Sequence, residues 1–336
     1  MANDIHVTAK RVSATDPAAI ELATRRLSAG GLVAFPTETV YGLGADATNG
    51  AAVAKLYAAK DRPAFNPLIS HVADITAARK LARFDRAAEK LAAVFWPGPM
   101  TLVLPKARTC TVADLATAGL DTIAVRVPAH PVAHRLIAAL GKPVVAPSAN
   151  RSGHVSPTTA DHVLADLADR IDLVLDGGPT PFGVESTIIA CLDGAPTLLR
   201  PGGVPREDIV GVLGHTLAEL PDACEGAAGD EDTPLAPGML ASHYAPHARL
   251  RLNSTVVNAG EALLAFGRNL PPGADRAVTT LNLSIQGDLV EAAANLFSHL
   301  RALDRAGAPV IAVMPIPRGG LGEAINDRLA RAAAPR

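Results

Sequence analysis

Short apolar runs alternate with amphipathic segments through the first two thirds of the chain. Between Asp16-Pro17, a helix-start signal, and Gly30-Gly31, a helix stop, apolar side chains recur at helical spacing. Residues 32–35 form a continuous apolar run that ends at Pro36, which is typical of a short buried strand. A second helix is predicted from Asn49 onward. This alternation predicts an α/β domain built on a mixed sheet.

The same signals continue along the chain. Further apolar runs predict strands at 68–72, 101–104, 122–127, 143–146, 173–175, 187–190 and 197–199. Amphipathic segments between them predict helices at 86–94, 132–140, 160–168 and 206–213.

The composition changes after these elements. No Lys or Arg occurs between Arg206 and Arg249, whereas acidic residues, Gly and Pro are frequent there, as in a linker. Beyond it, apolar runs at 263–266, 278–283 and 310–315 alternate with amphipathic segments at 289–303 and 321–332. That pattern predicts a small parallel-sheet domain. We therefore predict three parts: a large domain over 1–213, a flexible acidic Gly/Pro linker over 214–248 and a small α/β domain over 249–336.

Composition narrows the functional classes. The 336 residues include 31 Lys and Arg against 33 Asp and Glu, so the formal net charge is −2. That balance argues against a polybasic nucleic-acid-binding protein, and aromatic residues, at 3%, are too few for a base-stacking platform. The three cysteines form no Cys-x-x-Cys pair, and the N-terminus lacks the apolar stretch of a signal peptide. We expect a cytoplasmic protein without disulfides or membrane contact.

Several familiar motifs are missing or lie in the wrong context. The chain has no Gly-x-x-x-x-Gly-Lys-[Ser/Thr] loop. Gly42-Leu43-Gly44 fits a relaxed dinucleotide fingerprint, but Pro36 separates it from the preceding strand, where a Rossmann turn would follow directly. His243 and His247 are four residues apart, yet Pro246 breaks the helix that would align them as metal ligands.

Polar clusters follow the ends of several predicted strands and helices. Lys60 lies on the apolar side of its helix, with Arg62 beyond it. A cation there needs an anionic partner or an anion-binding cleft, although attraction to the helix C-terminus would also place a lysine at this position. Arg126, flanked by apolar residues, fits either a fork that binds a carboxylate or an exposed position on an amphipathic strand. Ser148 and Asn150 are typical of phosphate or ribose contacts.

Further polar segments lie at 36–44, 183–189 and 199–202. The first places two threonines and a glutamate between a strand and a predicted glycine turn. Each of these segments alone is also explained by ordinary turn chemistry, in which side chains bond the neighbouring backbone.

Seven segments occur together in a fixed order: PTETVYGLG, KDRPAFNPLISH, WPGPMTLVL, TIAVRVP, PSANRSG, GVESTI and LRPGG. This ordered set closely resembles the threonylcarbamoyl-AMP synthase family, also called YrdC-like. The later segments PGMLASHYAPHARL and GGLGEAINDRLARAA resemble its larger, two-domain form. The resemblance implies a twisted mixed sheet with helices in the first domain and a small Rossmann-like α/β domain at the C-terminus.

The resemblance also implies an activity. Family members are nucleotidyltransferases that make threonylcarbamoyl-AMP from L-threonine, bicarbonate and ATP and release pyrophosphate. The ATP would carry Mg²⁺, bound mainly through the triphosphate, so no protein metal ligands are implied. Downstream tRNA threonylcarbamoyl-transferase proteins would pass the product to the adenosine next to the anticodon. This chain would therefore serve tRNA only indirectly.

Site residues follow from the positions that match the family motifs. The implied catalytic tetrad is Lys60, Arg62, Ser148 and Asn150. The implied L-threonine contacts are Thr39, His71, Arg126, Ala146 and Ser186. The implied ATP contacts are Arg62, Asn66, Thr122, Ser148, Ser156, Arg200 and Tyr244.

Two other functions compete with this interpretation. A module that binds tRNA or double-stranded RNA by shape would need a basic concavity, which the net charge of −2 disfavours. A carbamoyl-transfer domain like that of hydrogenase maturation factors would be embedded in a much longer chain with acylphosphatase and zinc segments. Pyrophosphate release that depends on both threonine and bicarbonate would separate the three.

Overall fold

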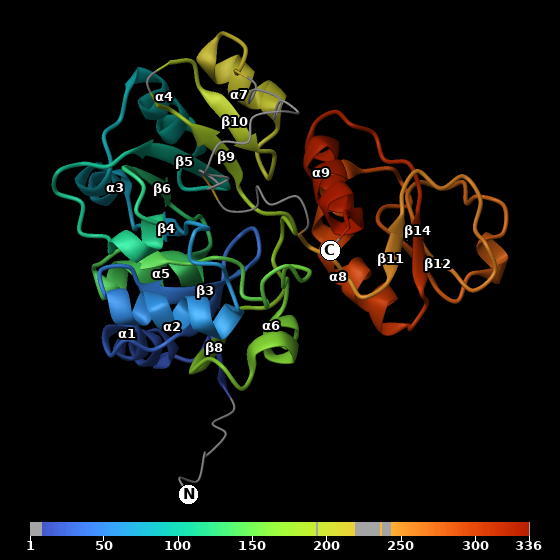
Figure 1. The fold of residues 1–336 in the computed structure, drawn as a ribbon, viewed down its shortest axis with the longest axis horizontal. Helices are drawn as coiled ribbons and strands as arrows, with labels where there is room; N and C mark the ends of the chain where they lie inside the picture. Colours follow the sequence, from blue (N-terminus) through green and yellow to red (C-terminus); the bar gives the residue numbers. More distant parts are fainter. Residues whose placement is uncertain (1–8, 193, 219–235, 237–242, 336) are drawn as a thin grey trace, which may run out of the picture.

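The computed structural model describes residues 9–192, 194–218, 236 and 243–335. The first domain is built on a sheet of ten strands (Figure 1). They are β1 Lys10–Ser13, β2 Val33–Pro36, β3 Tyr41–Asp46, β4 Ile69–His71, β5 Met100–Pro105, β6 Thr122–Arg126, β7 Val144–Val145, β8 Leu173–Asp176, β9 Thr187–Ala190 and β10 Thr197–Arg200. Their order is β1-β8-β2-β3-β7-β4-β6-β5-β9-β10, with parallel and antiparallel pairs, so the predicted mixed sheet is confirmed.

Helices cover both faces of this sheet. They are α1 Ala19–Ser28, α2 Gly50–Lys60, α3 Ile75–Leu81, α4 Arg86–Phe95, α5 Pro131–Leu140, α6 Ala160–Leu167 and α7 Arg206–Leu213, with a short 3-10 helix at Asp114–Thr117. Val33 and Phe35 of β2 pack with α1 and α5, whereas Ala34 faces the core that α2, α4 and α6 share. Successive strand residues thus point to opposite faces, as the two-residue period requires.

The second domain is a small parallel sheet with two long helices. Its strands, β11 Arg249–Arg251, β12 Ala262–Ala265, β13 Thr280–Asn282 and β14 Val310–Val313, lie in the order β11-β14-β12-β13. Helices α8 Leu289–Arg305 and α9 Leu321–Ala333 lie between this sheet and the first domain (Figure 1). The predicted α/β character of both domains is confirmed.

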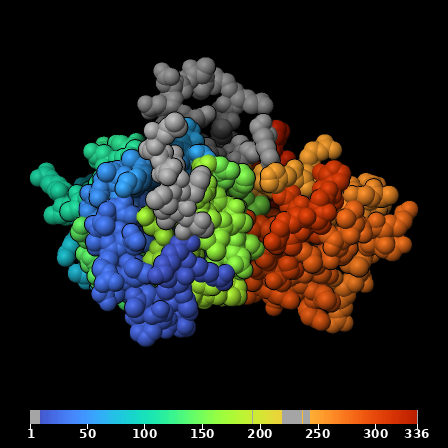
Figure 2. Space-filling model, turned by 90° about the horizontal axis from the view of Figure 1, so that it is seen from below, coloured from blue at the N-terminus to red at the C-terminus, as the bar shows by residue number. Residues whose placement is uncertain are grey.

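The two domains pack directly against each other, as Figure 2 shows. Arg301 of α8 pairs with Asp166 at 2.7 Å, and Arg206 of α7 pairs with Glu323 of α9 at 2.6 Å. The linker predicted over 214–248 falls largely on 219–235 and 237–242, which lie outside the described ranges. The predicted domain boundaries therefore stay a prediction.

Several elements differ from the prediction. Asp16 is not the N-cap of the first helix, because α1 begins at Ala19 and the Asp16 carboxylate instead accepts a hydrogen bond from the Ala18 amide at 2.9 Å. Strands β1 and β11 and the seven-residue helix α3 were not predicted. Both strands lie at sheet edges and carry exposed or half-buried side chains, so they leave no apolar run in the sequence.

The predicted glycine turn at 42–44 is wrong. Gly42 and Gly44 lie inside β3, which pairs antiparallel with β2. A Cβ on Gly44 would lie 2.7 Å from the Phe35 ring and 3.1 Å from Val144 Cγ1. The glycine is therefore required for close packing, and a dinucleotide-binding turn is excluded here.

Within the described part of the chain, no helix is long and apolar enough to cross a membrane.

Replacing Gly44 with Ala tests this packing constraint. The added methyl group must push β3 away from Phe35, so the free energy of unfolding should fall by about 1–3 kcal/mol. Urea denaturation measures it. Gly211→Ala is the matched control, because a Cβ on this exposed position of α7 meets no atom within 4 Å. It should stabilise the protein by about 0.5–1 kcal/mol. Equal stability of the Gly44→Ala and wild-type proteins would contradict the constraint.

Candidate active site

One pocket collects side chains from most of the predicted motif segments. It is lined by Thr37, Thr39, Val40, Gly42, Arg62, Ile69, His71, Arg126, Ala146, Pro147, Ser148, Glu185, Ser186, Arg200, His243 and Tyr244. The lining includes all five predicted L-threonine contacts and four of the predicted ATP contacts: Arg62, Ser148, Arg200 and Tyr244. Segments that are far apart in sequence therefore meet in a single cavity.

Sheet topology explains why these residues meet. His71 ends β4 and Arg126 ends β6, and the parallel register places these two residues side by side. Parallel strands bring their carboxyl ends to one edge of a sheet. The β2–β3 hairpin contributes Thr37 and Thr39 to the same pocket. Ser186 lies immediately before β9, which runs parallel to β5.

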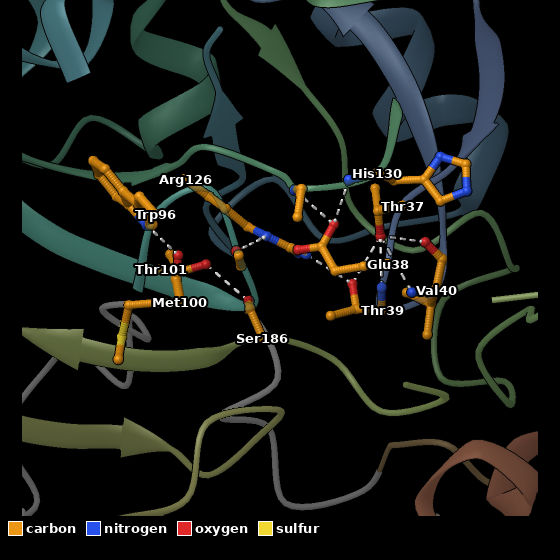
Figure 3. A network of polar contacts seen from close by, with 12 residues as sticks. Thr37, Glu38, Thr39, Val40, Trp96, Met100, Thr101, Arg126, His130 and Ser186 are labelled. Carbon is orange, nitrogen blue, oxygen red and sulfur yellow. Dashed lines mark hydrogen bonds and ion pairs between the residues drawn. The ribbon is translucent and has the colours of Figure 1, made fainter. Parts of the chain in front are cut away.

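Arg126 is buried and held by the protein on several sides (Figure 3). Its Nε donates to the Gly98 carbonyl at 3.2 Å, and its Nη2 donates to Glu38 and, at 3.1 Å, to Thr39 Oγ1. The alternative of an exposed position on an amphipathic strand is therefore wrong. Within the described part of the chain, Nη1 makes no hydrogen bond. Arg126 also lines the pocket, so its guanidinium carries positive charge to the wall of the cavity.

Glu38 is a buried carboxylate that the sequence analysis did not select. Its Oε2 accepts hydrogen bonds from the backbone amides of Ala129 and His130, at 3.0 and 3.2 Å, while Oε1 pairs with Arg126. Burial alone would raise the pKa of Glu38, but Arg126 and the backbone donors lower it below its ordinary value. The sequence signal that could have identified Glu38 is the position of a carboxylate between two threonines in an apolar hairpin.

The hydroxyl groups of the pocket form short chains of hydrogen bonds. Thr37 Oγ1 lies 2.8 Å from Thr39 Oγ1 and donates to the Val40 carbonyl at 2.7 Å, so the predicted turn chemistry also holds. Ser186 Oγ lies 2.8 Å from Thr101 Oγ1, and the Ser186 carbonyl accepts a hydrogen bond from Arg200 at 2.8 Å. These contacts fix the polar wall before any ligand arrives.

The guanidinium of Arg62 is likewise oriented from within. It donates to the side-chain oxygen of Asn66 at 2.6 Å and to the carbonyls of Asn66 and Pro67 at 3.1 and 2.9 Å. Burial is the largest cause that lowers the pKa of Arg62 to about 10, so it stays charged at neutral pH. Asn66 does not line the pocket; it supports Arg62 from behind.

Lys60 is buried, as predicted, but its partners are not anions. Its Nζ donates to the carbonyls of Ser148, at 2.5 Å, and Asn150. Burial, followed by repulsion from Arg62, lowers its pKa well below the ordinary value. The Asn150 side chain bonds the carbonyls of Arg151 and His154 at 2.7 and 2.8 Å. Both residues thus support the loop that presents Ser148, and neither lines the pocket.

Besides Asn66, two predicted ATP contacts lie outside the pocket lining. Ser156 donates to Glu185 Oε1 at 2.6 Å, so it reaches the pocket through that carboxylate. Thr122 begins β6, at the opposite end of the strand from Arg126, and pairs with Pro105. The structure does not bring Thr122 to the cavity.

The two histidines that line the pocket, His71 and His243, have neutral side chains. Burial lowers the pKa of His71 to about 3, and that of His243 to about 3 as well. The His71 Nδ1 donates to the Ile69 carbonyl at 3.2 Å. His243 lines the pocket, whereas His247 bonds Asp304 at 2.9 Å on the surface. Among the residues that the structure describes, no cluster of three His, Cys, Asp or Glu side chains is arranged to hold a metal ion.

The Glu38–Arg126 pair should make stability depend on pH. Because the folded-state pKa of Glu38 lies below its ordinary value of 4.5, the pair stabilises the protein at neutral pH, and the stabilisation is lost as pH falls through the folded-state pKa. Glu38→Gln should lower the free energy of unfolding by about 3–5 kcal/mol at neutral pH. The difference from wild type should shrink as pH falls below the ordinary value of 4.5 and through the lower folded-state pKa, because Glu38 then becomes protonated in the wild-type protein.

Denaturant titrations across this pH range measure the difference. The control is Glu21→Gln, which removes an exposed carboxylate that pairs with Arg25 on α1 and should change little at any pH. A Glu38→Gln penalty that does not vary with pH would contradict the assignment.

Comparisons with known proteins cover both domains. A family model described as telomere recombination matches residues 25–202, and one described as the C-terminal domain of threonylcarbamoyl-AMP synthase matches residues 204–334. The threonylcarbamoyl-AMP synthase of Pyrococcus abyssi is 43% identical over 327 residues, which is 94% of both chains. That of Bacillus subtilis is 40% identical over 337 residues, covering 97% of this chain and 95% of its own.

A solved structure agrees with these relatives. The crystal structure of P. abyssi Sua5 complexed with L-threonine matches with a TM-score of 0.83 and 40% identity, covering 94% of both chains. The agreement extends over the large mixed sheet and the small parallel sheet. The chain therefore belongs to the threonylcarbamoyl-AMP synthase family, in its two-domain form.

Proposed function

We propose that this chain makes threonylcarbamoyl-AMP from L-threonine, bicarbonate and ATP, and that pyrophosphate leaves. The observation that carries this proposal is the single pocket in which five predicted threonine contacts adjoin Arg62, Ser148, Arg200 and Tyr244. The related P. abyssi structure is a complex with L-threonine, which supports the amino-acid half of the site. This activity is that of a nucleotidyltransferase.

Two steps account for the product. The amine nitrogen of threonine, after losing a proton, attacks the carbon of bicarbonate, and water leaves as the carbamate forms. A carbamate oxygen then attacks the α-phosphorus of ATP, and the bond to the pyrophosphate group breaks. Both partners in the second step are anions, so the protein must hold them together against their repulsion.

The threonine half of the pocket suits an amino acid. Arg126 lines the cavity and would bind the α-carboxylate, while Thr39 and Ser186 offer hydroxyl groups. Because His71 is neutral, it adds no charge that would repel the substrate amine in its protonated form. Ala146 leaves space beside these polar groups.

The nucleotide half of the pocket suits a triphosphate. Arg62 and Arg200 place two guanidinium groups in the lining, and Ser148 adds a hydroxyl. Positioned cations of this kind stabilise charge that develops during phosphoryl transfer. Mg²⁺ would enter as part of the substrate, bound to the triphosphate oxygens. Lys60 and Asn150 would act by holding the loop that carries Ser148.

The product belongs to tRNA modification. We propose that separate transferase proteins move the threonylcarbamoyl group to the adenosine next to the anticodon, so this chain meets tRNA only indirectly. The alternative of an RNA-binding module is not favoured, since relatives at 40–43% identity over nearly the whole chain are named as synthases.

Purified protein should release pyrophosphate only when ATP, L-threonine and bicarbonate are all present. The measurement is a coupled pyrophosphate assay, with each substrate omitted in turn and with Mg²⁺ removed by a chelator. A threonine-dependent mass of the adenylate in the same reaction identifies the product. Pyrophosphate release that is independent of threonine or of bicarbonate would contradict the proposed function.

Arg126→Lys should weaken threonine binding by roughly 10- to 100-fold, because an ammonium group cannot keep the fixed guanidinium geometry that Glu38 and Gly98 impose. ATP affinity should change little. Titration calorimetry with each substrate separates the two effects. Arg79→Lys is the matched control, since Arg79 pairs with Glu89 on the surface and should leave both affinities unchanged. Wild-type threonine affinity in the Arg126 variant would remove the proposed contact.

A further inference from the structure

Arg328 is a fully buried arginine that the proposed reaction does not use. It comes from α9 of the C-terminal domain, yet its side chain reaches the first domain. Its Nε donates to Glu185 Oε2 at 2.8 Å, and its Nη2 donates to the Pro201 carbonyl at 2.9 Å. Its guanidinium carbon lies 5.2 Å from the centre of the Tyr244 ring. Burying a guanidinium completely is costly unless it is paired, so this position needs an explanation.

Three of its contacts lead to the wall of the pocket, and a fourth, the ion pair between its Nη1 and Asp327, lies within α9. Glu185 and Tyr244 line the pocket, and Pro201 follows Arg200, which also lines it. The other oxygen of Glu185 accepts a hydrogen bond from Ser156 at 2.6 Å. The Tyr244 ring also stacks on Phe297 of α8, with 5.5 Å between ring centres. One side chain of the second domain therefore joins three segments that form the nucleotide half of the site.

The charge of Glu185 makes its pairing important. It is the only carboxylate among the described residues that line the pocket, where Arg62 and Arg200 are proposed to meet a triphosphate. Burial would raise the pKa of Glu185, but Arg328 and Arg200 lower it below its ordinary value, so it is ionised at neutral pH. An unpaired carboxylate there would repel the phosphate groups.

Packing between the domains leaves this arrangement little freedom. A Cβ on Gly183, two residues before Glu185, would lie 2.3 Å from the Ala293 carbonyl oxygen of α8. A Cβ on Gly202, after Pro201, would lie 2.4 Å from the Glu185 carbonyl oxygen. Backbone therefore meets backbone on both sides of Glu185, and the position of α8 is tied to that of the pocket wall.

We propose that Arg328 is a positioning residue for the nucleotide half of the pocket. Arg328 neutralises Glu185 and holds Glu185, Pro201 and Tyr244 in place. The C-terminal domain then contributes directly to ATP affinity, without contacting the threonine half. The inference rests on the proposed function for the identity of the nucleotide.

Four variants test this role by ATP titration calorimetry, which needs no turnover. R328Q should weaken ATP binding by about tenfold or more, because Glu185 loses its neutralising partner. R328K keeps the positive charge beside Glu185 but cannot make the separate contacts to Glu185 and Pro201, so its ATP affinity should lie between those of R328Q and the wild type. E185Q/R328Q removes both charges and should regain most of the lost affinity, since no carboxylate remains unpaired. E323Q, which breaks the Arg206–Glu323 interdomain pair outside the pocket, is the matched control and should bind ATP as wild type does.

Steady-state pyrophosphate release supplies the second readout. R328Q should raise the KM for ATP by the same factor as the dissociation constant and leave the KM for threonine unchanged. Wild-type ATP affinity in R328Q, or an equal loss in R328Q and E185Q/R328Q, would overturn the proposal. If R328Q does not fold, the test uses the double variant E185Q/R328Q alone. An ATP affinity of this double variant tenfold below that of the wild type would overturn the proposal. A wild-type protein that binds ATP but releases no pyrophosphate would refute the proposed function and not this role.

Discussion

Guanidinium groups that are removed from water must be held by the protein, and this constraint shapes the pocket. Arg126 is held by Glu38 and the Gly98 carbonyl, and Arg62 by the oxygens of Asn66 and Pro67. Arg200 is held by the Ser186 carbonyl. Protein oxygens accept hydrogen bonds from some of the N–H groups of each of these guanidiniums, so the direction of each one is fixed before substrate arrives. Reorganisation during reaction is then small, which is how preorganised charges lower a barrier.

The mixed sheet makes this gathering of loops possible. The parallel pair β4 and β6 ends at His71 and Arg126, and the antiparallel partner β5 begins at the same edge. Since β9 runs parallel to β5, the residue before it, Ser186, also lies at this edge. A purely parallel sheet would need long crossovers to bring the same groups together.

Helices and strands with a strong periodicity of apolar residues could be predicted from the sequence. The residues that they contact in the fold could not. The apolar residues of α4, α5 and α8 recur at helical spacing, so these helices could be predicted. Lys60 was correctly placed on the buried side of its helix. The β3 strand was missed because Gly44 allows close contact with Phe35 and Gly42 allows close contact with Ala146, and no local sequence pattern records such contacts. The binding of Lys60 by loop carbonyls depends on residues 88 and 90 positions away.

For the candidate site too, the sequence identified individual residues but not the partners that they contact in the fold. The matching motifs identified residues such as Arg126 and Ser186 that do line the pocket, whereas Thr122, an implied ATP contact, starts the strand that Arg126 ends and lies outside the lining. Glu38, Glu185 and Arg328 were not selected, because a buried ion pair is recognised only when both partners are seen in space. Arg328 and Glu185 are separated by 143 residues.

That separation matters while the chain is being made. At roughly 5–20 residues per second, a ribosome needs roughly 7–30 seconds to travel from codon 185 to codon 328. Throughout this interval the first domain can build its sheet, but Glu185 has no guanidinium from α9 beside it. The nascent domain therefore carries an acidic group near Arg200 alone, whereas the finished protein also pairs it with Arg328. Its nucleotide wall matures only after the second domain has emerged and docked.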